Sequence, residues 1–505
     1  MRAAICSFVA AISVSSACVS RRPPGIDPDT RIAEADRLVH AGCYTCLRDA
    51  ATIYENLPPV AAFRTLTRRI ETLLLLAVRS RELDLGGSWL EQADLLLTNR
   101  STPELRVYRA IVDHIRAPAA VRTPEELEAD ATRARAARDQ LVRDAAVAIE
   151  TTARVDAVAA YFRLALACSE SMIGVPAAVM EVSSNVRDAP LVAFAMGTCS
   201  PDAASRLDEL VTHDVKWTDV HYYRAMHLLR DAAIVSADAA LAAAIAAFPD
   251  SRVVHLARAR VYLTLEEFEA ALEGFDYVAG RVPGQRDALL GRLVALSALG
   301  RHVDAENASN RLLELGTWHI GDAYYWRAWN RRRLNRLDEA AADIATAESY
   351  VINAAVYKLA GFIAYERDRQ DEALRHLNAS LERNASDCDV QFALGQVHGR
   401  RGEWAEAACS FGSAADCARD AQPPLRSRLE EIAASNLAPD RRARLRAGAE
   451  RKLADVVRQE GLAAIAAAEL YVRLNRTEGR TFAERASRWE EHREAASRLL
   501  SQLSK

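Results

Sequence analysis

Small and larger apolar residues alternate along the middle of the chain with the period of a helical hairpin. An alanine recurs every 33 to 35 residues in six successive units, at Ala237, Ala271, Ala305, Ala340, Ala373 and Ala407. Another small or apolar residue stands twelve positions earlier in each unit, at Ala225, Ala259, Leu293, Ala328, Gly361 and Gly395. A third, usually larger residue follows four positions after the alanine, at Leu241, Phe275, Ser309, Ile344, Leu377 and Phe411. Because antiparallel helices approach closely only where one presents a small side chain, this spacing predicts six two-helix units over residues 218–420.

Two of these units carry a fuller set of matching positions. They are Phe268, Ala271, Phe275 and Pro283 in one unit, and Gly402, Trp404, Ala407, Phe411 and Ala414 in the last. On these residues the chain resembles the tetratricopeptide repeat family, whose unit of about 34 residues is a helix A, a turn and a helix B. The resemblance implies an all-α fold, a right-handed superhelical α-solenoid of helical hairpins. It implies almost nothing about function, because one fold serves many functions.

The regions on either side of residues 218–420 are also expected to be helical. Residues 29–217 have helical periodicity with few strand signals, above all in 61–97 and 123–147. We interpret this region as degenerate repeats, with Gly42, Tyr44 and Tyr54 in a further helix B.

The C-terminal region is expected to cap the repeats. Pro423 and Pro424 interrupt the repeat pattern, and residues 421–505 then predict long charged helices, at 425–434, 439–475 and 479–502. A solenoid needs a polar terminal cap over its last exposed core face, and these helices would supply it. The arginines of the second helix would form either a basic recognition patch or a solvated face, and neighbouring carboxylates such as Asp440 and Glu450 favour the solvated face. These arginines are Arg441, Arg442, Arg444, Arg446 and Arg451.

The first residues have the layout of an export signal. Met1-Arg2 supplies a positive start, residues 3–14 are uncharged and mostly apolar, and Ser15-Ser16-Ala17-Cys18 resembles a bacterial lipobox with serine where leucine is usual. We expect a signal peptide at 1–17, lipidation of Cys18 and a tether at 18–28, although cleavage by ordinary signal peptidase fits the same bond. The protein is therefore expected to be exported and periplasmic, as an outer-membrane lipoprotein whose only membrane contact is the N-terminal lipid anchor.

Charge and motifs exclude several classes of function. With 65 basic and 69 acidic residues the net charge is -4, so nucleic acid is not an expected partner. No lysine follows a glycine, as a phosphate-binding P-loop requires, and neither His-Glu-x-x-His nor Gly-x-Ser-x-Gly occurs. The sequence thus predicts no catalytic residues, no cofactor and no metal site.

The cysteines predict disulfides, because an exported chain meets an oxidising compartment. Cys388 and Cys417 would lie at adjacent ends of one hairpin, and we expect them to be bonded. Cys43 and Cys46 form a Cys-x-x-Cys pair, for which a local disulfide is favoured over a redox centre or half of a zinc site. Cys168 and Cys199 could also pair. This pairing would leave Cys409 free, as a buried apolar residue.

Transfer of the family geometry implies that helix A of each unit lines a concave groove rich in aromatic residues and arginine. The groove-facing set is Tyr222, Tyr223, Met226, Arg260, Tyr325, Trp326, Trp329, Arg332, Arg333, Lys358, Phe362, Tyr365, Phe392 and Gln396. Such side chains suit recognition, yet each aromatic residue could equally pack between repeats. Family members that bind a peptide C-terminus use a lysine and an asparagine, and the matching Lys358 and Phe362 do not support that specific function.

A second recurrence places one arginine per unit, at Arg224, Arg258, Arg292 and Arg327. Stacked units would align these arginines into a ladder that repels itself unless acceptors intervene. Internal pairing, such as Arg327 with Asp343, is favoured over a track for an anionic ligand.

These observations favour a binding protein over an enzyme. The leading hypothesis is a scaffold that holds a protein or peptide of the cell envelope in the repeat groove. A carrier or sensor of glycan or peptidoglycan fragments, stacked on Tyr325, Trp326 and Trp329, is the alternative. A helical-solenoid enzyme acting on the cell wall ranks last, because no separate catalytic domain is apparent.

Overall fold

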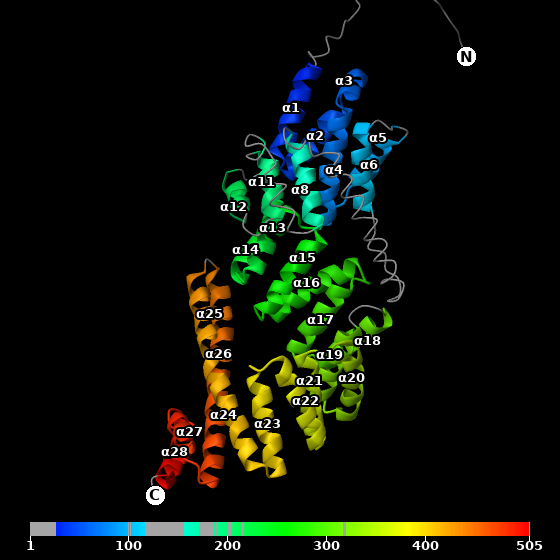
Figure 1. Ribbon diagram of the computed structural model, residues 1–505. Coiled ribbons are helices and arrows are strands. Elements are labelled where there is room, and N and C mark those ends of the chain that lie inside the picture. The colour runs from blue at the N-terminus through cyan, green and yellow to red at the C-terminus, as the bar shows by residue number, and fades with distance from the viewer. Residues whose placement is uncertain are drawn as a thin grey trace, which may run out of the picture.

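The regular elements that the structure describes are all α-helices. The computed structural model describes residues 27–98, 100, 103–116, 156–170, 186, 189–199, 204–213, 217–316, 320–435 and 437–503. Within these residues the predicted all-α solenoid is confirmed (Figure 1). The expected signal peptide, Cys18 and the predicted helical stretch 123–147 lie outside the described residues. Among the described helices, none combines the length and the apolar character needed to cross a bilayer.

The repeats form six helical hairpins, each a helix A followed by an antiparallel helix B. The pairs are α13 (Val220–Arg230) with α14 (Ile234–Ala247), α15 (Arg252–Thr264) with α16 (Phe268–Arg281), α17 (Arg286–Ala298) with α18 (His302–Glu314), α19 (Ile320–Arg333) with α20 (Leu337–Tyr350), α21 (Ala354–Glu366) with α22 (Gln370–Arg383), and α23 (Cys388–Arg401) with α24 (Trp404–Asp420). Each helix B packs on its own helix A, and the first five also pack on the next helix A along the chain, so the hairpins stack in a curved row (Figure 1).

The repeated alanines lie where the two helices of a hairpin meet. All six of them are fully buried. In the fifth hairpin a Cβ on Gly361 would lie 2.7 Å from the side chain of Leu377. In the sixth, a Cβ on Gly395 would lie 2.8 Å from the ring of Phe411. A small residue of helix A therefore receives a large residue of helix B, which is the packing that the spacing predicts.

Every hairpin turns through one residue in the left-handed conformation. These residues have φ between 57° and 77° and recur at one position of all six units, at Ala232, Glu266, Gly300, Asn335, Asp368 and Gly402. In each turn the residue that follows donates its N–H to the carbonyl five positions earlier, at 2.8 to 3.0 Å. This is the hydrogen bond of a Schellman cap, which satisfies a carbonyl at the end of helix A. Asp84 and Asn475 adopt the same conformation beyond the six units.

The N-terminal region is a second helical layer packed on the first repeat. Its described helices are α1 (Pro28–Ala41), α2 (Tyr44–Glu55), α3 (Pro59–Arg64), α4 (Leu66–Glu82), α5 (Trp89–Leu97), α6 (Pro103–Arg116), α8 (Ala157–Glu170), α11 (Pro190–Cys199) and α12 (Ala204–His213). One core cluster joins residues of α1 and α2 to residues of α4, α8 and α11, and it continues to Val220 of α13. Arg79 of α4 and Asp219, the residue before α13, form a fully buried ion pair at 3.1 Å. The two regions therefore share one core.

The C-terminal region contains four helices, α25 (Gln422–Ala434), α26 (Pro439–Arg473), α27 (Gly479–Ala486) and α28 (Glu490–Leu503). The expected single helix at 479–502 is wrong, because the chain turns at Ser487–Trp489. The turn brings Trp489 against Gly461 of α26, where a Cβ on the glycine would lie 3.0 Å from the ring. Helix α28 thereby folds back onto α26.

Helix α26 does more than cover the last unit. Its second half packs on α24, through Ala463, Ala464 and Ala467. Its first half extends past α24 to the first two hairpins, where Leu445 and Ala449 join a cluster with Leu241 of α14. In Figure 1, α25 and α26 run from beside α24 up to α14. The helix therefore links the last hairpin to the first two.

The described disulfides agree with two of the predicted pairs. Cys43 is bonded to Cys46, and Cys388 is bonded to Cys417 across the sixth hairpin. The side chains of Cys168 and Cys199 lie outside the described part of the structure. Cys409 is free as expected but exposed, so its predicted burial is wrong. The buried position of that helical turn belongs to its neighbour Ala408.

Candidate functional site

The predicted groove residues all lie on helices A, and none of them is fully buried. They come from α13 (Tyr222, Tyr223, Met226), α15 (Arg260), α19 (Tyr325, Trp326, Trp329, Arg332, Arg333), α21 (Lys358, Phe362, Tyr365) and α23 (Phe392, Gln396). Successive helices A contact one another, from α15 to α23. A side-chain contact between Arg332 and Phe362 links the residues of α19 and α21, whereas Phe392 of α23 packs on Phe411 of α24.

The three residues on α13 serve mainly to join parts of the fold. The ring of Tyr223 lies 5.1 Å from Phe194 of α11 in an edge-on contact, and its hydroxyl donates to Glu82 of α4. Tyr222 and Met226 pack against the cluster that contains Leu241 and the α26 residues. Packing between elements thus accounts for these side chains.

Five residues on α19 and α21 form what we call the aromatic stripe: Tyr325, Arg332, Lys358, Phe362 and Tyr365. Each of the three rings packs on a core cluster and keeps part of its surface exposed. The Arg332 guanidinium lies 5.1 Å and the Lys358 ammonium 5.7 Å from the centre of the Phe362 ring. Cation–π attraction favours this arrangement of the side chains.

Three cations of the helix A surface are already paired between neighbouring helices. Arg332 donates two hydrogen bonds to Glu366, at 2.6 and 3.0 Å. Lys358 donates to Asp387 at 2.9 Å and to Asp389 at 2.7 Å, which links α21 to α23. Arg260 pairs with Asp287 of the next helix A at 3.3 Å. The charge of these three cations is therefore largely neutralised within the fold.

The pairing also moves the pKa values of the groups around Lys358. Burial alone would lower the pKa of Lys358, but the carboxylates of Asp389 and Asp387 outweigh it and raise that pKa above the usual value. Burial alone would raise the pKa of Asp389, and the Lys358 ammonium outweighs that effect and lowers it. Both shifts stabilise the charged pair.

The arginine ladder is matched by carboxylates at every step. Its pairs are Arg224 with Asp208, Arg258 with Asp238, Arg292 with Asp276 and Arg327 with Asp343. The predicted pair Arg327–Asp343 is confirmed, with hydrogen bonds of 2.6 and 2.9 Å. In the other three pairs the aspartate comes from the helix before the arginine. The ladder therefore belongs to the packing of the repeats, and it leaves no free cationic track for an anion.

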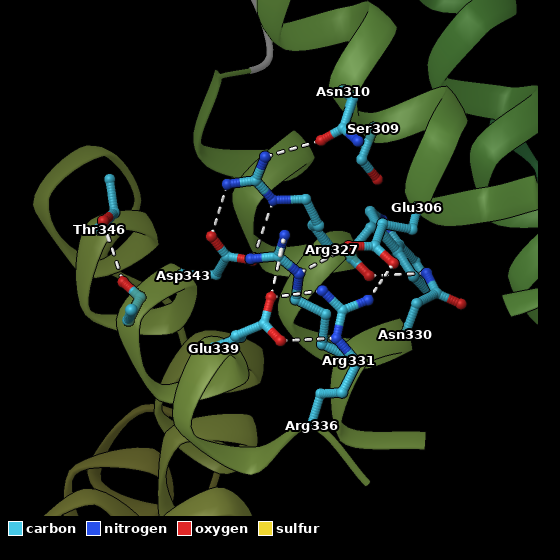
Figure 2. A network of polar contacts seen from close by, with 12 residues as sticks. Glu306, Ser309, Asn310, Arg327, Asn330, Arg331, Arg336, Glu339, Asp343 and Thr346 are labelled. Carbon is cyan, nitrogen blue, oxygen red and sulfur yellow. Dashed lines mark hydrogen bonds and ion pairs between the residues drawn. The ribbon is translucent and has the colours of Figure 1, made fainter. Parts of the chain in front are cut away.

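At its fourth step the ladder widens into a polar network between α18, α19 and α20 (Figure 2). Arg331 donates to Glu306 of α18 and to Asp343 of α20, both at 2.8 Å. Arg336, just after α19, reaches the other oxygen of Glu306 at 2.7 Å. Figure 2 shows the guanidinium groups lying between the carboxylates of the two flanking helices. The network fixes how this hairpin docks on the preceding one.

A cleft of about 620 Å³ separates the start of α16 from α25 and α26. One wall is acidic and the other basic: Glu266, Glu267, Glu269 and Glu273 face Arg428, Arg444, Arg451 and Lys452. At its edges Arg441 is bonded to Asp238 and Glu267, and Lys452 pairs with Glu266 at 3.0 Å. Arg441 therefore anchors α26, which neither interpretation of the arginine cluster predicts. Arg444, Arg446 and Arg451 are exposed, as expected of a solvated face.

Sequence reasoning missed the contacts of α26 with the first hairpins. The i, i+4 spacing of Leu445 and Ala449 indicates an apolar face on this helix. Nothing in that spacing says which distant hairpin the face covers. Within the described residues, no three His, Cys, Asp or Glu side chains lie close enough together to hold a metal ion.

Comparison with known proteins adds little to this description. No protein-family model matches the chain, and no curated protein matches its sequence. Among solved structures, a tetratricopeptide repeat protein from Parabacteroides merdae ATCC 43184 is similar at 13% identity, over 58% of this chain and 99% of that one, with a TM-score of 0.39. PilW, a type IV pilus biogenesis factor, is similar at 14% identity over 39% of this chain and 90% of its own, with a TM-score of 0.36. The APC/C complex Cut9–Hcn1 matches at 14% identity, covering 95% of this chain and 90% of that chain, with a TM-score of 0.36. These TM-scores are low, so the all-α repeat fold rests on the helices described above.

Proposed function

We propose that this chain is a non-catalytic scaffold of the bacterial cell envelope that binds a segment of another protein on its aromatic stripe. The observation that carries the proposal is the composition of the stripe. Partly exposed rings of Tyr325, Phe362 and Tyr365 lie among cations that are already paired. Such a surface gains binding energy mainly by burying ring area, so it suits an extended, apolar or aromatic peptide segment.

The alternative, a glycan carrier, fits the ring geometry less well. Sugars stack on a flat ring face, whereas Tyr325 and Trp326 meet at 82° and Trp326 and Trp329 at 63°. Trp326 also packs against the core cluster that contains Leu293 and Leu296. The two tryptophans thus use much of their surface on each other and on the core.

Export to an oxidising compartment is supported by the disulfides Cys43–Cys46 and Cys388–Cys417. Such bonds persist outside the cytoplasm and are rare within it. Together with the lipobox-like residues before Cys18, they support an outer-membrane lipoprotein facing the periplasm. Mass analysis of the mature N-terminus tests this location, since an acylated Cys18 is expected and an unmodified one would refute the anchor.

Site-specific photocrosslinking in cells tests the binding surface. A photoreactive amino acid at position 325 or 362 is expected to capture one and the same protein. The matched control is position 350, because Tyr350 is 59% exposed but lies at the end of helix B in α20. Equal capture at position 350, or crosslinks only to α26 of the same chain, would contradict the proposal.

A further inference from the structure

The short helix α3 presents an apolar surface that no other described element covers. Val60 is 77% exposed and Phe63 is 75% exposed, and they lie three residues apart on one face of the helix. Leu57 and Ala61, by contrast, are buried in the N-terminal core cluster. Two exposed apolar side chains beside well-buried ones form a small projection, which we call the α3 knuckle.

The knuckle lies next to the point where the N-terminal segment joins the fold. Asp27 caps the first turn of α1, and Arg64 of α3 donates a hydrogen bond of 2.6 Å to Asp29 in that turn. Figure 1 places α3 and the start of α1 at the same end of the molecule. Residues 19–27 reach at most about 30 Å when fully extended. A membrane that holds Cys18 would therefore be within reach of Phe63.

We propose that the α3 knuckle inserts Val60 and Phe63 into the lipid surface that holds Cys18, so that this end of the solenoid rests on the membrane. The inference rests on the lipid anchor of the proposed function. A second membrane contact strengthens an anchor made by acyl chains alone, because each buried apolar side chain adds to the affinity. The charge of Arg64 is already matched by Asp29, so the contact is apolar and insensitive to salt.

Photocrosslinking in native membranes tests whether lipid contacts the α3 knuckle. The full chain carries a photoreactive amino acid at position 63, and the membranes are irradiated without extraction. Phospholipid adducts are expected at least about tenfold more often at position 63 than at position 350. Insertion of about half of an aromatic side chain into lipid favours the bound position by about that factor. The adducts persist in about 1 M NaCl, which screens surface charge. Val60→Asp lowers the yield at position 63 by about tenfold, because it places a charge on the inserted face.

Ser497→Asp is the matched control, because it adds a charge to an exposed position of α28 at the other end of the chain, and it leaves the yield unchanged. Circular dichroism checks that both variants keep the helical fold. An acylated N-terminus without lipid adducts at position 63 overturns the knuckle and leaves the anchor intact. Adducts with a second copy of the chain, or with residues 1–26, also overturn it. Lipid adducts on a chain that is not acylated support the knuckle and refute the anchor.

Discussion

At the scale of single residues, the arginines of the ladder serve the packing of the repeats. Each arginine of the ladder has an aspartate partner, and three guanidinium groups share three carboxylates in the network around Asp343. An aligned row of cations is unstable without such partners, since like charges repel in a partly buried setting. In the proposed function, recognition is therefore assigned to the rings of the aromatic stripe.

Asp343→Asn tests the network. Asp343 is 4% exposed and accepts hydrogen bonds from both Arg327 and Arg331. The amide would leave the partly buried Arg327 without its carboxylate partner and would remove one of the carboxylates of Arg331, so the free energy of unfolding is expected to fall by about 3 kcal/mol. Denaturant unfolding measures the loss. The control is Glu450→Gln, which breaks the exposed ion pair with Arg446 on α26. It is expected to change the free energy of unfolding by about 0.5 kcal/mol or less.

The pair of Lys358 with Asp389 predicts a plateau in stability against pH. The lowered pKa of Asp389 means that its contribution is complete above the unfolded value of about 3.9 and is lost as pH falls through the folded value. The raised pKa of Lys358 means that its contribution is complete below about 10.4 and is lost as pH rises through the folded value. The stability difference between wild type and Lys358→Met is therefore expected to be constant near neutral pH, at about 1 kcal/mol because the groups are partly exposed.

Thermal unfolding of both proteins from acid to alkaline pH measures this difference. It should shrink at both ends of the range. A difference that grows as pH falls below the plateau would contradict the assigned pairing.

Some residue-level features could not be predicted from the sequence. Gly300 and Gly402 mark left-handed turns because glycine favours a positive φ. Ala232 and Glu266 adopt the same conformation without any such signal. The stacked hairpins impose the turn on whatever residue stands there, so the repeat register predicts it better than the residue type does.

At the scale of elements, the small-to-large packing within a hairpin was predictable, because it depends on residues at fixed spacing. Gly361 against Leu377 and Gly395 against Phe411 follow the spacing inferred from the alanines. The division of the expected last helix into α27 and α28 was not predictable. It depends on the packing of Trp489 against Gly461 of α26. A local sequence pattern does not show that these two residues are in contact.

Substitution of two glycines in α23 distinguishes the effect of close packing on stability from the effect of helix propensity. Gly395→Ala is expected to destabilise the protein by about 1 to 3 kcal/mol, because the added Cβ meets the Phe411 ring at 2.8 Å. Gly399→Ala, one turn later, meets nothing within 4 Å and is expected to stabilise the helix by about 0.5 to 1 kcal/mol. Chemical denaturation of both variants measures whether the free energy of unfolding falls or rises. A gain in stability for Gly395→Ala would mean that the hairpin is looser than the structure describes.

At the scale of the whole molecule, α26 changes the picture that the repeats alone suggest. The six hairpins could be predicted as an open curved row, because each unit contacts only its neighbours. The return of α26 to the first two hairpins could not, because it pairs residues such as Arg441 and Asp238 that lie about 200 positions apart. The described chain thus resembles a closed loop more than an open row, and α26 limits how far the hairpins can spread.

Arg441→Glu tests this brace. The new carboxylate would face Asp238 and Glu267, and like charges at a partly buried contact should lift the first half of α26 from the hairpins. Hydrogen exchange is expected to rise at Leu445 and Ala449, and small-angle scattering should record a larger radius of gyration. The exposed neighbour Arg446→Glu serves as the control, and both quantities should stay near wild type because Arg446 pairs only within α26. Unchanged hydrogen exchange in Arg441→Glu would mean that the apolar contacts alone hold α26 against the first two hairpins. The contact between α26 and these hairpins would then persist at any salt concentration.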